Sequence, residues 1–327
     1  MTDSHLHGIT MNFSILLLLA IFAVTFYSGS SVHATTFDSP SSEIQESFSN
    51  DSFNCITFDP EERIVTITCK SASLSDVNNQ LVNQDILRRD ETVDKGWVLD
   101  AGITIAENAT LHINSTDTSW LKIVADGGET AYPITVYGSL KIDSVKVTSW
   151  NPNSNNYTTS EDSDRNGDDV SIGTPRPYIV VAEDSTGTTD ITNSEIAYLG
   201  YESGYGGGRT GLRYESGDGS IISGNNIHNL YFAFYSKGVG GMIIENNRIH
   251  NNIHYGLDPH TGTHDMSIKN NTVHDNGSIG IICSLDCYNI VIEDNKVYNN
   301  TKMGIMFSRN MFDSIARNNV VSSEDNG

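Results

Sequence analysis

The sequence predicts an all-β fold, a parallel β-helix (solenoid) with coils of about 22–24 residues, on two observations. A short pattern of alternating strand, Asn-rich turn and second strand recurs through the C-terminal part of the chain. The composition favours Asn, Ser, Thr, Gly, Ile and Val over the Ala, Leu, Glu and Lys mixture that long helices need. With 327 residues, the chain is long enough to bury a substantial core.

The columns of the repeat appear when its copies are stacked. The copies begin at positions 221, 243, 267, 291 and 314, so successive starts lie 22, 24, 24 and 23 residues apart. An Asn column falls in the turn, at Asn225, Asn247, Asn271, Asn295 and Asn318. An inward aliphatic column follows, at Ile227, Ile249, Val273, Val297 and Val320. Side-chain amides can hydrogen-bond from coil to coil, so both columns are interpreted as structural.

A histidine column accompanies them. His228, His250 and His274 share one position of the repeat with Tyr298. We interpret these histidines as turn residues and not as ligands, because their recurrence follows the structural period.

The first residues are typical of an export signal. An apolar run from Ile15 to Tyr27 precedes small residues and an acceptable cleavage site at positions 32–34. We therefore interpret residues 1–34 as a signal peptide, and we expect a secreted, periplasmic or cell-surface protein that is not integral to the membrane after signal removal. An uncleaved membrane anchor is the alternative.

The rest of the chain divides into two parts. Residues 35–95 are predicted to form an N-terminal segment with a small disulfide-linked hairpin that caps the solenoid, because an open solenoid end is an unpaired sheet edge. Residues 96–327 are then the β-helix domain. The chain stops in the turn of a coil, so we expect it to be truncated and to lack its last coils.

Four cysteines fit an oxidising compartment. Their spacing predicts two local disulfides, Cys55 with Cys69 and Cys283 with Cys287, and free buried thiols are the alternative. Asn-x-Ser/Thr sequons agree with an exported glycoprotein, at Asn108, Asn114 and Asn156.

The net charge of −22 argues against binding to nucleic acid or anionic membranes. The charge is uneven, because residues 1–208 carry 10 Lys and Arg against 29 Asp and Glu, whereas residues 209–317 carry 9 against 10. The C-terminal half is therefore nearly neutral and can present a local positive surface to a polyanion.

A polar loop between positions 151 and 175 contains alternating oxygen side chains before and after a Gly, at Asp162, Asp164, Asn166 and Asp168. This pattern is typical of a calcium loop, although the Glu that closes such loops is absent. Calcium binding and a plain acidic loop are both compatible with it.

The repeat breaks in one coil. Third strands normally read as packed apolar residues after a Gly, but the coil that follows position 243 reads Gly256, Leu257, Asp258, Pro259, His260. Strand alternation keeps Leu257 and Pro259 inward, so Asp258 and His260 project from the outer face about 7 Å apart. We expect Gly238 and Ser284 beside His260, and Ser236 and Ile282 beside Asp258. A general base next to a carboxylate predicts a catalytic pair, with Tyr255 just ahead of it.

The segment from Tyr255 to His260 resembles the periplasmic type of mannuronan C5-epimerase, which acts on alginate. The resemblance covers roughly residues 97–320. It also includes VTSW at 147–150, PRPYIV at 175–180, SEIAYLGY at 194–201, NNRIHNNIHYG at 246–256, GSIGIICS at 277–284 and GIMFSRN at 304–310.

This resemblance implies a right-handed parallel β-helix that serves as the catalytic domain of an isomerase. It further implies that His260 removes the C5 proton of a mannuronate residue, with Asp258 and Tyr255 as its partners. The expected partner is an anionic polysaccharide, the expected state is a monomer, and no redox cofactor is required.

Two positions depart from the family pattern, Thr261 in place of an Asp and Leu285 in place of an Arg. The second matters more, because a uronate C5 proton is removed only when the adjacent carboxylate is neutralised as enolate charge develops. Arg309 occupies the column of Leu285 one coil later, about 5 Å along the axis, and is predicted to reach back. Further substrate-binding candidates are Lys237, Lys302 and Ser284.

Two alternatives stay open at this point. A polysaccharide lyase forms the same carbanion and expels the C4 substituent instead of taking back a proton. A non-catalytic glycan-binding or envelope β-helix protein would retain the motif without its chemistry, and Leu285 and the acidic balance favour that interpretation somewhat.

Overall fold

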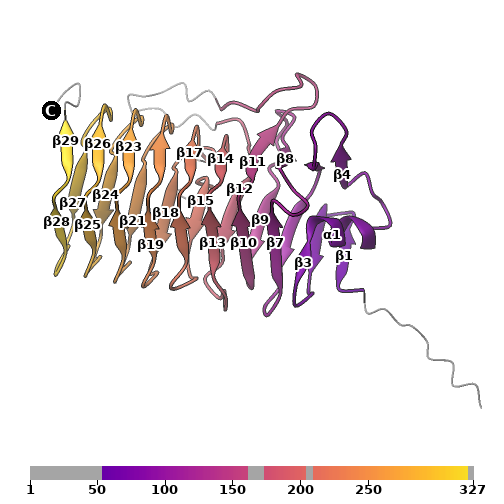
Figure 1. Ribbon diagram of the computed structural model, residues 1–327, viewed down its shortest axis with the longest axis horizontal. Coiled ribbons are helices and arrows are strands. Elements are labelled where there is room, and N and C mark those ends of the chain that lie inside the picture. Colours follow the sequence, from indigo (N-terminus) through magenta and orange to yellow (C-terminus); the bar gives the residue numbers. More distant parts are fainter. Residues whose placement is uncertain (1–53, 161–172, 204–208, 323–327) are drawn as a thin grey trace, which may run out of the picture. The chain divides into compact units, whose positions relative to one another are not determined.

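The computed structural model describes residues 54–160, 173–203 and 209–322. In this part of the chain the strands stack into three sheets, here called A, B and C, and successive coils add one strand to each sheet. Figure 1 shows the coils side by side, from the indigo end with β1 to the yellow end with β29.

The sheets contain the following strands. Sheet A comprises β1 (Ile56–Asp59), β2 (Ile64–Ile67), β6 (Gly102–Ile105), β9 (Pro133–Val136), β12 (Tyr178–Val181), β15 (Leu212–Tyr214), β18 (Phe234–Lys237), β21 (Leu257–His260), β24 (Ile281–Ser284) and β27 (Ile305–Ser308). Sheet B comprises β3 (Ala72–Ser73), β7 (Thr110–Asn114), β10 (Ser139–Asp143), β13 (Thr189–Thr192), β16 (Ile221–Ser223), β19 (Ile243–Glu245), β22 (Ser267–Lys269), β25 (Val291–Glu293) and β28 (Ile315–Arg317). Sheet C comprises β4 (Leu87–Asp90), β5 (Gly96–Leu99), β8 (Trp120–Val124), β11 (Lys146–Trp150), β14 (Glu195–Ala197), β17 (Asn226–His228), β20 (Arg248–His250), β23 (Thr272–His274), β26 (Lys296–Tyr298) and β29 (Val320–Ser322).

The strands are short because each alternates between a buried inward residue and a more exposed outward one before the chain turns. β10 shows the pattern, with Leu140 and Ile142 buried in the core and Ser139, Lys141 and Asp143 on the outside. Stacked in parallel, the inward side chains form one continuous core along the helix axis. The all-β prediction is confirmed.

Residues 54–95, the described part of the predicted N-terminal segment, belong to the same compact unit as the coils. β1 and β2 form an antiparallel hairpin closed by the Cys55–Cys69 disulfide, and β2 pairs in parallel with β6. The single helix of the described residues, α1 (Leu74–Gln80), begins at an N-cap in which Ser73 and Asp76 form a capping box. Its buried Leu74 and Val77 join the core at this end. The hairpin and helix therefore continue into the first coils, with no structural break near residue 95.

The Asn column forms a hydrogen-bonded ladder inside the turn between sheets B and C. Each buried amide donates from Nδ2 to the Oδ1 of the next Asn, at 2.9 Å from Asn225 to Asn247 and from Asn247 to Asn271. The ladder ends at Asn319 and not at Asn318, and the aliphatic column ends at Val321, because the last coil is 24 residues long. The predicted last copy was therefore one residue out of register.

The histidine column lies on strands and not in turns, which corrects the prediction. His228, His250 and His274 project from the outer face of sheet C on β17, β20 and β23. Neighbouring rings stack at 5.0 Å, and Tyr298 continues the stack at 4.8 Å from His274. The period that places an inward aliphatic residue one position earlier also places these rings outward.

The predicted Cys283–Cys287 disulfide is wrong. Both cysteines are free and buried in the core, Cys283 on β24 and Cys287 after the following turn. The thiol of Cys287 donates to the carbonyl oxygen of Ser284 at 3.1 Å, which satisfies it without a partner sulfur.

Thiol titration should distinguish the two cysteine pairs. In denaturant without reductant, we expect a thiol reagent to react with two cysteines per chain, and with all four after reduction. The native protein should react slowly, because burial raises the pKa of Cys287 to about 11 and that of Cys283 well above its usual range. Detection of no free thiol in the unfolded, unreduced chain would contradict the assignment.

Two predictions fall outside the described residues, the signal peptide at 1–34 and the calcium loop at Asp162, Asp164, Asn166 and Asp168. Among the residues that the structure describes, no cluster of three His, Cys, Asp or Glu side chains could hold a metal ion. None of the helices in this described portion is long and apolar enough to cross a membrane.

Candidate functional site

The site is built on β21, where the repeat breaks. Leu257 is buried in the core, so the next outward side chain is Asp258 and the one after Pro259 is His260. Pro259 has no N–H to donate inside the sheet, and β21 pairs with β24 at Leu257 and His260 with no paired residues between them. A strand that gives up sheet hydrogen bonding in its centre suggests a role beyond packing.

The neighbours of this strand differ from the prediction on one side. Lys237, not Gly238, lies beside His260, and Tyr235, not Ser236, lies beside Asp258. The reason is that β18 and β21 are offset by 23 residues, one more than the spacing of the preceding repeat copies. On the other side, Ser284 pairs with His260 as expected.

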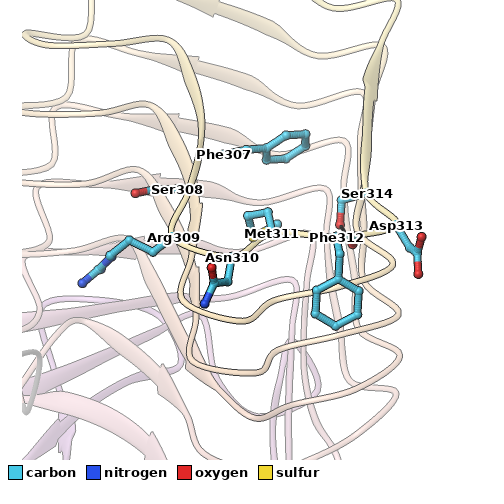
Figure 2. A pocket seen from close by; sticks show the side chains of 8 residues that line it. All are labelled: Phe307, Ser308, Arg309, Asn310, Met311, Phe312, Asp313 and Ser314. Atoms are coloured by element: carbon cyan, nitrogen blue, oxygen red, sulfur yellow. Dashed lines mark hydrogen bonds between the residues drawn. The ribbon is translucent and has the colours of Figure 1, made fainter.

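Arg309 reaches the site from the coil that follows β24. Its Nη2 lies 3.0 Å from His260 Nε2 and donates to the Ser284 hydroxyl at 3.1 Å. Arg309 and Leu285 take matching places in the turns after β27 and β24, both with a positive φ, of 56° and 64°. Figure 2 shows the extended Arg309 side chain pointing away from Phe307 and Met311. The Arg309 side chain therefore reaches back by one coil to His260 and Ser284.

Asp258 is a buried carboxyl with an unsatisfied oxygen. The residue is 3 % exposed, and Oδ1 has no hydrogen-bond partner. Burial raises the pKa of Asp258 to about 8, although the Arg309 charge opposes the shift. Asp258 is therefore protonated at neutral pH and can donate a hydrogen bond.

His260 has the opposite shift. Burial and, second, the Arg309 charge lower its pKa, so the imidazole is neutral at pH 7. Its Nδ1 lies 2.5 Å from the Thr261 hydroxyl, and its ring stacks on Tyr235 with centroids 5.6 Å apart. Arg213 lies over the other side of Tyr235, at 4.9 Å from the ring centroid. These contacts fix the plane of the base.

An aromatic cluster borders the site at the turn before sheet A. Tyr231, Phe232 and Tyr235 are buried against each other, with Ile253 and Tyr255 packed on them. Tyr255 lies 4.9 Å from the Phe232 ring, edge to face. Burial and the nearby Asp258 raise the pKa of Tyr255, so its hydroxyl keeps its proton.

The two predicted lysines are placed differently from Arg309. Lys237 is exposed and lines a groove with Thr261 and three acids, Glu183, Glu215 and Asp218. Lys302 lies in the exposed turn ahead of β27, and no hydrogen bond within the described residues joins its side chain to His260 or Asp258. The structure thus brings together Asp258, His260, Ser284 and Arg309, with Tyr255 nearby, and leaves Lys302 apart.

Comparison with known proteins agrees with this architecture. A family model described as a right handed beta helix region matches residues 178–327. The fold is a right-handed parallel β-helix. A search of curated proteins gave no significant sequence match.

Two solved structures are similar along most of this chain. The periplasmic alginate epimerase AlgG is 21% identical, with a TM-score of 0.66, over 77% of this chain and 58% of that one. A double mutant of AlgG is 19% identical, with a TM-score of 0.64, over 79% and 63%. The chain thus spans about three fifths of the length of these relatives, and at such identities the likeness establishes the fold.

Sequence reasoning missed the Arg213–Tyr235–His260 stack. The correct strand offset would have placed Tyr235 beside Asp258, and strand alternation would then have placed Arg213 in the same outward column. Nothing in the repeat alone shows that Thr261 contacts the base, because its φ of 38° at the start of a turn is a local feature.

Proposed function

We propose that this chain is a carbohydrate-active enzyme that epimerises uronic acid residues at C5, mannuronate to guluronate, within an exported or cell-surface polysaccharide. The observation that carries the proposal is the position of the Arg309 guanidinium, 3.0 Å from Nε2 of the neutral His260 imidazole. A base and a permanent cation at this distance can act on the C5 proton and the C6 carboxylate of one sugar ring.

In the proposed reaction, Nε2 of His260 takes the C5 proton. The C–H electron pair moves into the C6 carboxylate, and the resulting enolate charge is stabilised by Arg309. A proton then returns to C5 from the opposite face, supplied by water, and the configuration inverts. His260 finally gives its proton back to solvent, so the cycle needs no redox cofactor.

The buried neighbours suit the same reaction. The protonated Asp258 can donate a hydrogen bond to the carboxylate oxygen on which charge develops, and its exposed fraction of 3 % keeps water from competing. Tyr255 keeps its proton and is a second donor at the rim. The aromatic cluster offers an apolar wall against which a sugar ring can lie.

The charges around the site suggest where the polymer runs. Three acids line the groove beside Thr261, where Lys237 is the single basic lining residue, so this end repels a polyanion. The carboxylate of the reacting sugar therefore belongs at the Arg309 end. We also propose export to an oxidising compartment, which the Cys55–Cys69 disulfide supports.

The test is hydrogen exchange at C5. Polymannuronate incubated with the protein in deuterated water should take up deuterium at C5, and NMR of the product should show guluronate without chain cleavage. An unsaturated sugar at a new chain end would instead show β-elimination and a lyase. Absence of exchange on polymannuronate and other polyuronates would favour a glycan-binding protein.

The pH profile of the C5 exchange rate should be bell-shaped. On the acid side it should fall below the lowered pKa of His260, under the ordinary histidine value of 6.5, because a protonated imidazole cannot take a proton. On the alkaline side it should fall near pH 8, as Asp258 loses the proton that it donates. A pH series of kcat/KM, from initial rates at polymannuronate concentrations well below saturation, measures both limbs in the substrate-free protein.

The Asp258→Asn variant is the matched control for this profile. Its amide has the same shape and cannot ionise, so the alkaline limb near pH 8 should disappear while the acid limb stays. An unchanged alkaline limb in Asp258→Asn would assign that ionisation to another group.

A further inference from the structure

The hydrogen bond between Arg309 and His260, which supports the proposed function, also occupies the base while no substrate is bound. A guanidinium is always protonated and only donates, so the hydrogen bond from Arg309 Nη2 uses the lone pair of His260 Nε2. The ring proton then resides on Nδ1, which donates to the Thr261 hydroxyl at 2.5 Å. Both nitrogens of the base are therefore occupied, and Nε2 is not free to accept a proton from a substrate.

We propose that Arg309 masks His260 in the substrate-free protein, and that a uronate carboxylate releases it by drawing the guanidinium onto itself. The inference rests on the proposed function and adds a selection step to it. A neutral sugar leaves the base masked, whereas a sugar with a free carboxylate unmasks it.

The transfer of the Arg309 guanidinium from His260 to a substrate carboxylate is favourable for three reasons. A carboxylate accepts two parallel hydrogen bonds from a guanidinium and has the opposite charge, whereas Nε2 of the neutral imidazole accepts one bond and has no charge. The side chain of Arg309 is exposed in a turn, so its movement disturbs no core packing. The second hydrogen bond, to the buried hydroxyl of Ser284, can stay in place as a pivot.

Around His260, few groups other than Arg309 could change the pKa of the imidazole. On its own strand the nearby acid is Asp258, which is neutral below about pH 8. β18 contributes Tyr235 and the exposed Lys237, and β24 contributes the uncharged Ser284. Arg309 is thus the charged group bonded to the imidazole, and its departure should raise the pKa of His260.

NMR of the full chain labelled with ¹⁵N-histidine tests the masking. His260→Gln assigns the ring signals, whose shifts report the tautomer and, over a pH series, the pKa. In the substrate-free protein we expect the Nδ1–H tautomer and a pKa lower than in Arg309→Leu. Saturating oligomannuronate should raise the wild-type pKa by about one unit, and the methyl ester of the same oligomer should not.

The outcomes separate this inference from the proposed function, because deuterium uptake at C5 is read on the same samples. C5 exchange by oligomannuronate with an unchanged His260 pKa overturns the unmasking alone, as does an equal rise with the methyl ester. A pKa rise specific to the carboxylate, without C5 exchange, supports the unmasking and overturns the epimerase. A His260 signal that responds to neither oligomer, together with no C5 exchange, overturns both.

Discussion

Replacing His260 with Ala should abolish deuterium uptake at C5. Loss of a positioned general base costs about 10²–10⁴-fold in rate. Within the described site, His260 is the neutral nitrogen base that lies within hydrogen-bonding distance of Arg309. His260→Ala should still bind oligomannuronate, because Arg309 and Ser284 keep their own hydrogen bond. Initial rates of C5 exchange by NMR, with binding by calorimetry, separate the loss of chemistry from the loss of affinity.

His250→Ala is the control for this substitution. His250 is another partly buried outward histidine, but it lies on β20 in sheet C and stacks between two other histidines. Its loss should affect stability and leave the exchange rate per folded molecule unchanged. Residual exchange in His260→Ala at the rate of His250→Ala would show that another group removes the proton.

The coil architecture is predictable from this sequence because it depends on periodic residues. The Asn ladder and the aliphatic core repeat at intervals of 22 to 24 residues, and each coil repeats the same physical requirement, an amide in the turn and an apolar residue inward. The error in predicting the columns concerned the register of the last coil. The ladder ends at Asn319 and not at the predicted Asn318, because the last interval is 24 residues. A period alone does not give the length of each turn.

The candidate site lies on a strand whose residues depart from the repeat pattern, which is why the sequence alone points to it. Asp258 and His260 occupy outward positions that the two following coils give to uncharged residues, and this difference is visible in the sequence. The reach of Arg309 followed from counting one coil further. The stacking of Tyr235 on His260 could not be predicted, because it depends on an offset of 23 residues between β18 and β21.

The cysteines show the limit of spacing arguments. Cys55 and Cys69 flank a hairpin whose antiparallel strands bring them together, so the chain geometry supports their bond. Cys283 and Cys287 are closer in sequence, but both are taken up by the core of the solenoid. Proximity along the chain predicts a disulfide only when the local backbone directs both side chains to the same point.

Replacing Arg309 with Leu should lower the C5 exchange rate by about 10²–10³-fold, the usual effect of losing one group that stabilises developing oxyanion charge. The same change frees Nε2 of His260, which by itself favours proton removal. The two effects are unequal, because a hydrogen bond from a charged donor contributes about 1.5–3 kcal/mol, and solvent around the exposed Arg309 keeps this one at the lower end, roughly tenfold in rate. The net result should therefore be a loss of rate, and it should appear in kcat with polymannuronate.

Arg317→Leu is the control for this substitution. Arg317 lies one turn later on β28, more than half exposed and paired with Glu293, so its loss should leave the rate unchanged. A rate for Arg309→Leu equal to that of Arg317→Leu would mean that another cation neutralises the substrate carboxylate, or that no carboxylate is neutralised in this site.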